Sequence, residues 1–443
     1  KRKLMGSEQE YIDIFDRHRE LIDEPCAKLL NDERAKAIIR FKATGFPGIK
    51  EENWLHTNIA KRFSADYGMN LGRVEMKAGT HDIFTCDVPN LRTHQAYIIN
   101  DTFHPGNNGK PLPEGVILGS LNEIAENHPA LLAPYYNSLA GKGDSTVQFN
   151  TAFVQDGVLL YIPKNLSVEE TVQIVALLQA NVEMMSNRRL LIILEENSKA
   201  SLLLCDHSSL QQKSLSTQVT EIFIGRGASL DLYELEETAG NNTRVGSLFV
   251  RQNADSRFNH CNITLTNGFT RNSIEVSLEG KGAETSINGL AIGDKEQHID
   301  NRTLVDHKVP HCTSNELYKY ILDEQSTGVF AGKMLIRPDA QQTVSEQTNR
   351  NLCLTSCAHM YAQPQLEIYA DDVKCSHGST VGQLDESALF YMQQRGIPAD
   401  EARHLLMYAF AGEVIDSIGI DALRDRLHML VEKRFRGELN HCK

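Results

Sequence analysis

The stretch DDVKCSHGST, residues 371–380, places a thiol and an imidazole two positions apart. Alternate residues of a β-strand point to the same face, so Cys375 and His377 would point together if this stretch is a strand. Thiolate and imidazole are ligands for zinc and for iron–sulfur clusters. Two ligands cannot complete a tetrahedral site, so a metal here needs further ligands from elsewhere in the chain or from another chain. The alternative is that both side chains serve only the fold.

A second group of soft ligands precedes this pair: Cys353, Cys357 and His359. On a single strand these three side chains would share one face. A buried free cysteine is also a common small apolar residue, which favours a packing role for the group. The sequence therefore leaves a ligand role and a packing role open.

Nucleotide and hydrolase motifs are missing from the sequence. GNNGKP and GVFAGKM lack the spacing or the hydroxyl of a phosphate-binding loop, and GKGAET lacks the third glycine of a dinucleotide fingerprint. Neither G-x-S-x-G nor H-E-x-x-H occurs. Acidic pairs such as Glu195 and Glu196 fall at turn borders, where a solvated surface is the simpler interpretation. We expect no catalytic residues and no nucleotide hydrolysis by this chain.

Before the Cys375–His377 pair, from about residue 144 to 373, short runs alternate between apolar and polar residues and are separated by turns. NITLTN, SIEVSLEG and QLEIYA each place their apolar side chains on one face, which predicts half-buried strands. Long helical patterns are absent from about residue 144 to 373. This pattern excludes a fold of alternating strands and helices.

Short turns that contain an alanine recur through this region, at Ala200, Ala228, Ala254, Ala283 and Ala340. Their spacings are 28, 26, 29 and 57 residues, and the last is close to two of the others. The missing turn would fall near His311. Evenly spaced strands and turns without helices predict a solenoid of parallel strands. A β-sandwich with evenly spaced turns remains the alternative.

Helical patterns occupy both ends of the chain. Apolar residues recur with helical spacing between residues 11 and 41, and Ser120 lies three residues before Glu123 as in a capping box. Near the C-terminus, Asp385 is a candidate helix N-cap and Gly396 a candidate stop, and two further helical stretches follow. A helical tail of some sixty residues buries little by itself, so it must pack on the body or on a partner.

Composition narrows the class of protein. Of 443 residues, 45 are Lys or Arg and 58 are Asp or Glu, which gives a net charge of −13. Such an acidic chain is not expected to bind nucleic acid. No apolar run reaches the length of a membrane span, the first ten residues are charged, and nine cysteines show no paired spacing. We expect a cytoplasmic protein with reduced thiols.

Four stretches resemble a known family. They are GFPGIKEENWLHT, FNTAFVQDGVLLYIPKN, DNRTLVDHKVPHCTSNELYKYIL and PQLEIYADDVKCSHGSTVGQLDESALFYMQQRGI. Together and in this order they resemble the SufB/SufD family of iron–sulfur cluster assembly proteins of the SUF system. The K-C-S-H-G sequence resembles the corresponding stretch of SufD-like members of the family, whereas SufB-like members lack it.

The resemblance implies a right-handed parallel β-helix between helical ends. We expect three domains: an N-terminal helical and α/β region over residues 1–143, the β-helix core over 144–380, and a C-terminal helical domain over 381–443. The resemblance also implies that the chain forms a complex with SufB and the ATPase SufC. SufB would pair with this chain through the β-helices, and SufC would dock on the C-terminal helices.

The same resemblance carries roles to individual residues. Cys375 and His377 become metal ligands in a site shared with a SufB-like partner, where an iron–sulfur cluster or iron binds transiently; no tightly bound cofactor is expected. His311 and Cys312 match a family stretch whose role we interpret as structural. For the docked ATPase we choose Tyr408 and Phe410 as anchors, because aromatic residues dominate interface energetics.

Two functions of different classes follow. The first is a non-enzymatic scaffold for cluster assembly. Without its partner, the isolated chain could pair with a second copy of itself as a homodimer. The second is a β-helix enzyme that acts on polysaccharide. The second would need a groove with aspartates and stacked aromatic rings, whereas aromatic residues make up only 7% of the chain.

Overall fold

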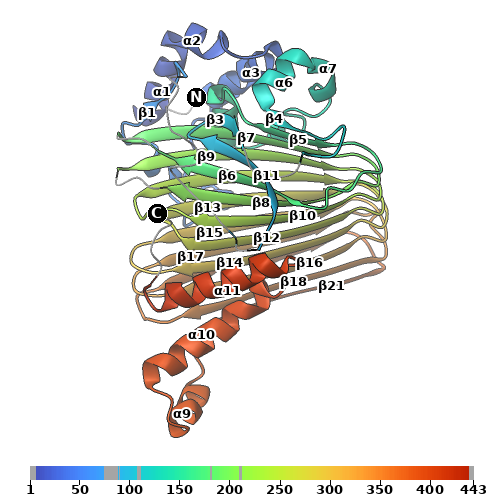
Figure 1. Cartoon of the computed structure of the whole chain (residues 1–443). Coiled ribbons are helices and arrows are strands. Elements are labelled where there is room, and N and C mark those ends of the chain that lie inside the picture. Colours follow the sequence, from blue (N-terminus) through green and yellow to red (C-terminus); the bar gives the residue numbers. More distant parts are fainter. Residues whose placement is uncertain are drawn as a thin grey trace.

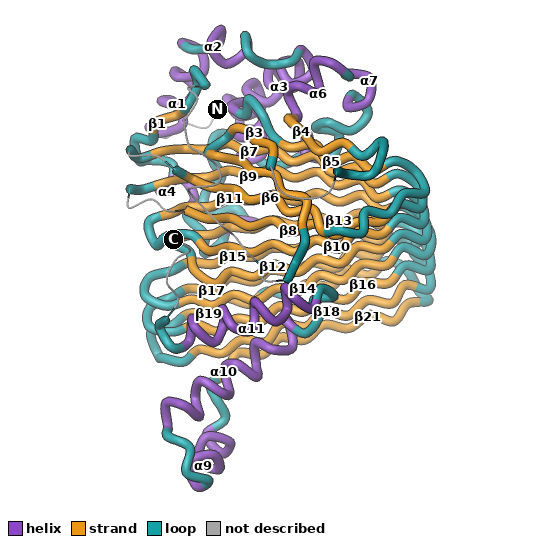
Figure 2. The backbone as a smooth tube through the Cα atoms, viewed as in Figure 1, coloured by secondary structure: helices purple, strands orange, loops and turns teal. Residues whose placement is uncertain are grey.

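Two long parallel sheets, stacked coil upon coil, form the body of the protein (Figures 1 and 2). The computed structural model describes residues 6–73, 88, 90–106, 111–179, 182–208 and 212–438. The fold is the β-solenoid that the alternation and the turn spacing predict. Each strand pairs in register with the strand one coil before and one coil after it.

Sheet A contains β5 (Val158–Ile162), β7 (Met184–Leu194), β9 (Ser214–Ile224), β11 (Asn242–Gln252), β13 (Phe269–Leu278), β15 (His298–His307), β17 (Thr327–Ile336), β19 (His359–Ala362) and β20 (Gln365–Ile368). Sheet B contains β2 (Thr93–Ile99), β6 (Thr171–Leu178), β8 (Lys199–Ser208), β10 (Ser229–Glu237), β12 (Arg257–Thr266), β14 (Glu284–Gly293), β16 (Thr313–Leu322), β18 (Thr343–Cys353) and β21 (Val373–Gly382).

From β7 to β17, tight turns join each strand of sheet A to the next strand of sheet B, and one residue in each of these turns adopts a left-handed conformation. These residues are Asn197, Gly227, Asp255, Gly282, His311 and Gln342. The turn expected near His311 is confirmed, with φ at 62°. Glycine, asparagine and aspartate tolerate this conformation best, which explains four of the six residues. The repeated alanines mark the same turns, and all but Ala254 are buried against the lumen or its corner.

The N-terminal region closes one end of the solenoid (Figure 1). There β3 (Thr102–Pro105) and β4 (Ile117–Ser120) pair antiparallel with β2 and β5, and β1 (Gly68–Met69) pairs with β7. The helices of this region are α1 (Gly6–Arg17), α2 (Arg19–Asp23), α3 (Lys28–Thr44), η1 (Glu52–Trp54), α4 (Ile59–Arg62), α6 (Leu121–Asn127), α7 (Pro129–Leu132), η2 (Ala140–Lys142) and α8 (Ser145–Phe153).

The sequence predicts the helix cap at Ser120 but not the helix α8 that precedes the first strand of the core. The Ser120 cap is confirmed, because its side chain accepts a hydrogen bond from the amide of Glu123. The strand pattern from residue 144 was expected to begin at once, but α8 comes first. Asp144 caps α8 by accepting from the amides of Thr146 and Val147, and every residue of this helix is buried.

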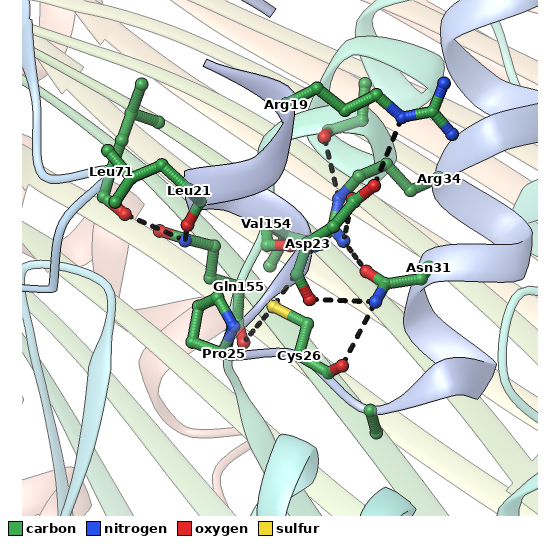
Figure 3. Close-up of polar contacts among 12 residues, drawn as sticks. Arg19, Leu21, Asp23, Pro25, Cys26, Asn31, Arg34, Leu71, Val154 and Gln155 are labelled. Atoms are coloured by element: carbon green, nitrogen blue, oxygen red, sulfur yellow. Dashed lines mark hydrogen bonds and ion pairs between the residues drawn. The ribbon is translucent and has the colours of Figure 1, made fainter.

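A buried arginine fastens the N-terminal helices to the first coil (Figure 3). The Arg34 guanidinium donates to the carbonyl oxygens of Ala152 and Val154 and forms an ion pair with Asp23 at 3.0 Å. It also lies 3.4 Å from the Cys26 sulfur, and the Cys26 thiol donates to the Gln155 carbonyl. Burial raises the pKa of this thiol, so Cys26 is a protonated packing group.

The segment around Trp54, part of the GFPGIKEENWLHT stretch, is clamped along the outer face of sheet A. Arg271 stacks over the Trp54 ring at 4.3 Å and donates to the Asn53 carbonyl. Arg302 donates to the carbonyls of Glu52 and Leu55, and both arginines pair with the fully buried Asp300. One buried carboxylate therefore orients both arginines that hold this segment.

The C-terminal helices are α9 (Glu386–Gln394), α10 (Ala399–Ile415) and α11 (Asp421–Phe435). The second half of α10 and all of α11 cover the outer face of sheet B in one apolar cluster that includes Ala411, Leu427 and Leu235. Arg434 fixes the end of α11 through Asp294 and the Leu265 carbonyl. The first half of α10 and α9 project from the body as an arm (Figure 1).

The lumen of the solenoid changes character along its length. Valine, isoleucine and leucine share its first coils with buried polar groups, among them the ion pair between Arg188 and Asp206 at 2.9 Å. The inward row of β18 is polar and buried throughout: Thr343, Ser345, Gln347, Asn349 and Asn351. These groups bond to neighbours within the lumen, as Ser314 does with Ser345 at 2.8 Å and Gln347 with Glu316 at 2.6 Å. Buried polar groups need such partners to avoid a desolvation cost.

Glu316 makes the stability of the fold depend on pH. Burial raises its pKa to about 7, from an ordinary value of 4.5. Between these values the unfolded chain has released the proton that the folded chain still holds, so stability falls as pH rises through this window. Glu316→Gln is expected to remove this loss and to be more stable than wild type near pH 8.5 by up to roughly 3 kcal/mol, with a smaller difference near pH 5.

Urea unfolding at the two pH values measures this effect. The control is Glu346→Gln, which changes an exposed glutamate on the same sheet. A stability difference between Glu316→Gln and wild type that does not grow with pH would contradict the expectation.

Candidate metal and partner site at the open end

The end of the solenoid opposite the N-terminal helices is open. β21 pairs only with β18, and β19 and β20 pair only with β17, so all three strands have a free edge within the described residues. Such an edge presents backbone donors and acceptors that another strand can satisfy. Apolar side chains are exposed beside it, with Val381 at 54% and Tyr369 at 61%. The open end therefore has the features of a pairing surface.

Cys375 and His377 lie on β21, as the strand pattern predicts. Cys375 pairs in register with Ser345, and His377 with Gln347. Because Ser345 and Gln347 are buried in the lumen row of β18, Cys375 and His377 continue that row at the open end. The structure thus places the thiol and the imidazole on one face, at the mouth of the lumen.

The two side chains differ in their surroundings. Cys375 is half-buried beside Ile336, Ala340 and Ala370, and His377 is exposed. Burial raises the pKa of the Cys375 thiol, and a hydrogen bond from the Ser345 backbone opposes the rise. The thiol is therefore mainly protonated when the end is open, and binding a metal would release its proton.

The other soft-ligand group does not share a strand. Cys353 ends β18 in sheet B, Cys357 lies in the following turn, and His359 begins β19 in sheet A. The premise that these three residues occupy one strand is wrong, because the chain turns between the sheets there. Cys353 packs against the lumen core, and burial raises its pKa. Cys357 and His359 are exposed on the rim of the open end.

Within the part of the chain that the structure describes, no three His, Cys, Asp or Glu side chains are placed to hold a metal ion together. Cys375 and His377 could supply two ligand atoms at most, so a metal held here would need its remaining ligands from another molecule. Cys312 is buried, and its thiol donates to the Gly280 carbonyl at 3.4 Å, which agrees with a structural role for the His311–Cys312 turn.

The predicted anchors lie in α10 where the arm joins the body, and further aromatic residues lie on the arm itself. Tyr408 and Phe410 are half-buried at its root: Tyr408 lies against His428 at 5.3 Å between ring centres, and Lys319 lies over the Phe410 ring at 4.3 Å. In contrast, α9 buries no residue, and Phe390 and Tyr391 are 63% and 60% exposed.

A groove of about 520 Å³ lies on the outer face of sheet A, between the Trp54 segment and the residues around Lys142. Phe249 is the one aromatic residue among the described residues that line it. Stacked aromatic rings, which a polysaccharide enzyme would need, are not present in this lining. No helix of the described residues is both long and apolar enough to cross a membrane.

Comparison with known proteins agrees with this architecture. Residues 177–410 match the SufBD core domain of the SUF system for FeS cluster assembly, and residues 5–174 match the SufBD protein N-terminal region. The chain belongs to the SufB/SufD family. An iron–sulfur cluster assembly SufBD family protein of Synechocystis is 28% identical over 416 residues, which cover 92% of this chain and 91% of that protein.

Two relatives named iron–sulfur cluster assembly protein SufD also match. The Escherichia coli protein is 36% identical over 167 residues, which cover 38% of this chain and 40% of its own length. The Bacillus subtilis protein is 26% identical over 327 residues, which cover 73% of this chain and 75% of its own. The family assignment supports a role in iron–sulfur cluster assembly and leaves the polysaccharide alternative without support.

Two sets of residues at these surfaces were not predicted from the sequence: the polar inward row of β18 and the exposed aromatic residues of α9. The polar lumen row of β18 carries a signal, because TVSEQTNRNLC is polar at the alternate positions that should be apolar in a buried strand. The exposed aromatics of α9 carry a weaker one, since Phe390 and Tyr391 are adjacent and cannot both face the same helix partner.

Proposed function

We propose that this chain is a non-enzymatic scaffold subunit of a SUF complex, which pairs with a SufB-like subunit and binds a SufC-type ATPase. The observation that carries the proposal is the free edge of β21 with Cys375 and His377 in its lumen row, in a chain of the iron–sulfur assembly family. The pairing supplies the ligands that these two residues lack.

End-to-end pairing with a similar solenoid would satisfy the open edges. A partner strand alongside β21 would pair with its free backbone groups and would cover Val381 and Tyr369. A partner with the same architecture fits this surface best, because its own last coil has the same two-sheet cross-section. The isolated chain could use the same surface to form a homodimer.

A site divided between two subunits suits a cluster that must be released. Cys375 and His377 would supply two ligands, and the partner would supply the rest. Separation of the subunits, or a small change at the seam, would then remove half of the ligands. The cluster or iron is the cargo of this site, and no resident cofactor is proposed.

The arm is the proposed docking surface for the ATPase. Its exposed aromatics on α9 would make the outer contacts, and Tyr408 and Phe410 would contribute at its root. Deleting the whole tail is a poor test, because α10 and α11 cover apolar residues of sheet B such as Leu235 and Ile263. Substitutions confined to the arm avoid this damage.

The pairing is tested by Val381→Asp. A carboxylate at the mouth of the lumen would be buried without a partner on association, so binding to the SufB-like subunit should weaken at least about tenfold. Analytical ultracentrifugation of the mixed subunits gives the affinity. Val344→Asp is the control, because Val344 is 47% exposed on the outer face of β18. Equal affinity for wild type and Val381→Asp would place the seam elsewhere.

The ligand role is tested by His377→Ala in the full complex. Because this change removes one of two ligand atoms, maturation of iron–sulfur enzymes in cells should fall well below the wild-type rate while the complex still elutes intact from gel filtration. Ser376→Ala, a change at an exposed neighbour on the same strand, should leave the rate unchanged. An intact His377→Ala complex that matures these enzymes at the wild-type rate would exclude the ligand role.

ATPase docking is tested by the double variant Phe390→Ser, Tyr391→Ser. Exposed aromatics often supply most of the binding energy at an interface, so affinity for the ATPase should drop at least about tenfold. Because α9 buries none of its residues, thermal stability should stay close to wild type. Tyr408→Ala and Phe410→Ala provide the comparison: loss of stability without loss of ATPase binding would assign these two residues to packing. If the double variant bound the ATPase as tightly as wild type, the docking surface could not lie on α9.

A further inference from the structure

The residue directly behind His377 in the lumen is Gln347. Its Cα is the register partner of His377, and its side chain points into the lumen with no exposed area. The Gln347 Nε2 donates to Glu316 Oε2 at 2.6 Å, one coil further in. A row of three inward side chains on adjacent strands therefore runs from the buried carboxyl to the imidazole at the open end.

The chemistry of the amide fixes what Gln347 can still do. A glutamine side chain has a donor nitrogen and an acceptor oxygen, and Glu316 already engages the nitrogen. The Gln347 Oε1 is buried and has no hydrogen-bond partner among the described residues. A buried acceptor without a donor is costly, so this oxygen favours a donor placed on its open side. His377 is the inward side chain on that side.

The facing sheet is shaped around the same amide. Gly332 of β17 lies opposite, and a Cβ at this position would come within 2.3 Å of Gln347 Nε2. Any other residue at 332 would push the Gln347 side chain out of its place. The amide is thus held from two sides, by Glu316 through a hydrogen bond and by Gly332 through the space it leaves.

We propose that Gln347 is a positioning residue for His377: its Oε1 accepts a hydrogen bond from one ring nitrogen of His377. A neutral imidazole has one N–H donor and one nitrogen with a free lone pair. With the N–H held by Gln347, the lone pair is directed out of the open end, where a divalent metal or cluster iron can bind. This inference rests on the proposed ligand role of His377.

Nitrogen NMR of the isolated chain, labelled with 15N in histidine, tests the contact without any metal. The spectrum separates the two neutral tautomers, and His377→Gln identifies the signal of His377. In wild type, one tautomer should predominate and its N–H should exchange slowly with water. In Gln347→Met, which keeps the side-chain length without polar atoms, both tautomers should appear and exchange should be faster by about tenfold, the factor expected for one lost hydrogen bond.

Two further variants keep the test decisive. Gly332→Ala should reproduce the effect of Gln347→Met, because it displaces the amide without altering it, and it serves as the test if Gln347→Met does not fold. Asn351→Leu removes another buried amide from the same lumen row, next to Val381, and should leave the His377 tautomer unchanged.

A wild-type tautomer ratio and exchange rate in both Gln347→Met and Gly332→Ala would overturn the proposal. This result is distinguishable from a failure of the proposed function. If His377→Ala matures iron–sulfur enzymes normally while the tautomer still depends on Gln347, the contact is real and the ligand role is wrong.

Discussion

Every coil of this protein depends on its two neighbours for hydrogen bonds. The strands of a parallel solenoid satisfy their backbone groups only between coils, so a coil at either end has one row of unpaired donors and acceptors. At the first end, antiparallel strands β3 and β4 and the N-terminal helices cover this row. At the last end, β21 lies uncovered within the described residues. The asymmetry between the two ends sets where the chain can associate.

The in-register pairing of neighbouring coils also explains how polar side chains can be buried inside the lumen. Strands in register place equivalent side chains one above another, so a polar residue meets its partner on the adjacent coil. Ser314 and Ser345 are register partners of this kind, with their hydroxyl oxygens 2.8 Å apart, and His307 contacts Ser314 at 2.9 Å across the turn within one coil. Among the described residues no basic side chain pairs with Glu316, and burial raises its pKa to about 7. The polar rows of the last coils thus extend to the mouth of the lumen, where Cys375 and His377 continue them.

Much of the fold is visible in the sequence because it is local and repeated. Period-two alternation identifies the strands, and the spacing of the alanine-containing turns gives the coil length and places a further turn near His311, where the structure has one. The helix α8 was not anticipated, because the Asp144 cap outweighs the weak strand pattern that follows it. The direction of Cys375 and His377 could be predicted as well, since strand alternation decides it.

The contacts around the site could not be predicted, because they join residues far apart in the sequence. Gln347 lies beside His377 only through the register between β18 and β21, and it lies opposite Gly332 only across the lumen. The choice of Tyr408 and Phe410 rested on residue type, but their exposure depends on how α10 divides between the body and the arm. The resemblance to the family identifies the C-terminal helices as the docking region, and the structure separates the half-buried aromatic residues of α10 from the exposed ones of α9.

The one-coil repeat also has a metric consequence. Neighbouring strands of a sheet lie about 4.8 Å apart, so the separation between the N-terminal cap and the open end can change only in steps of this size. A gain or loss of one coil would shift the Cys375–His377 row by one step, and would also rotate it slightly through the twist of the sheets. The number of coils therefore sets the distance between the two ends of the solenoid. Relatives that keep this distance must keep the same number of coils, even where their side chains differ.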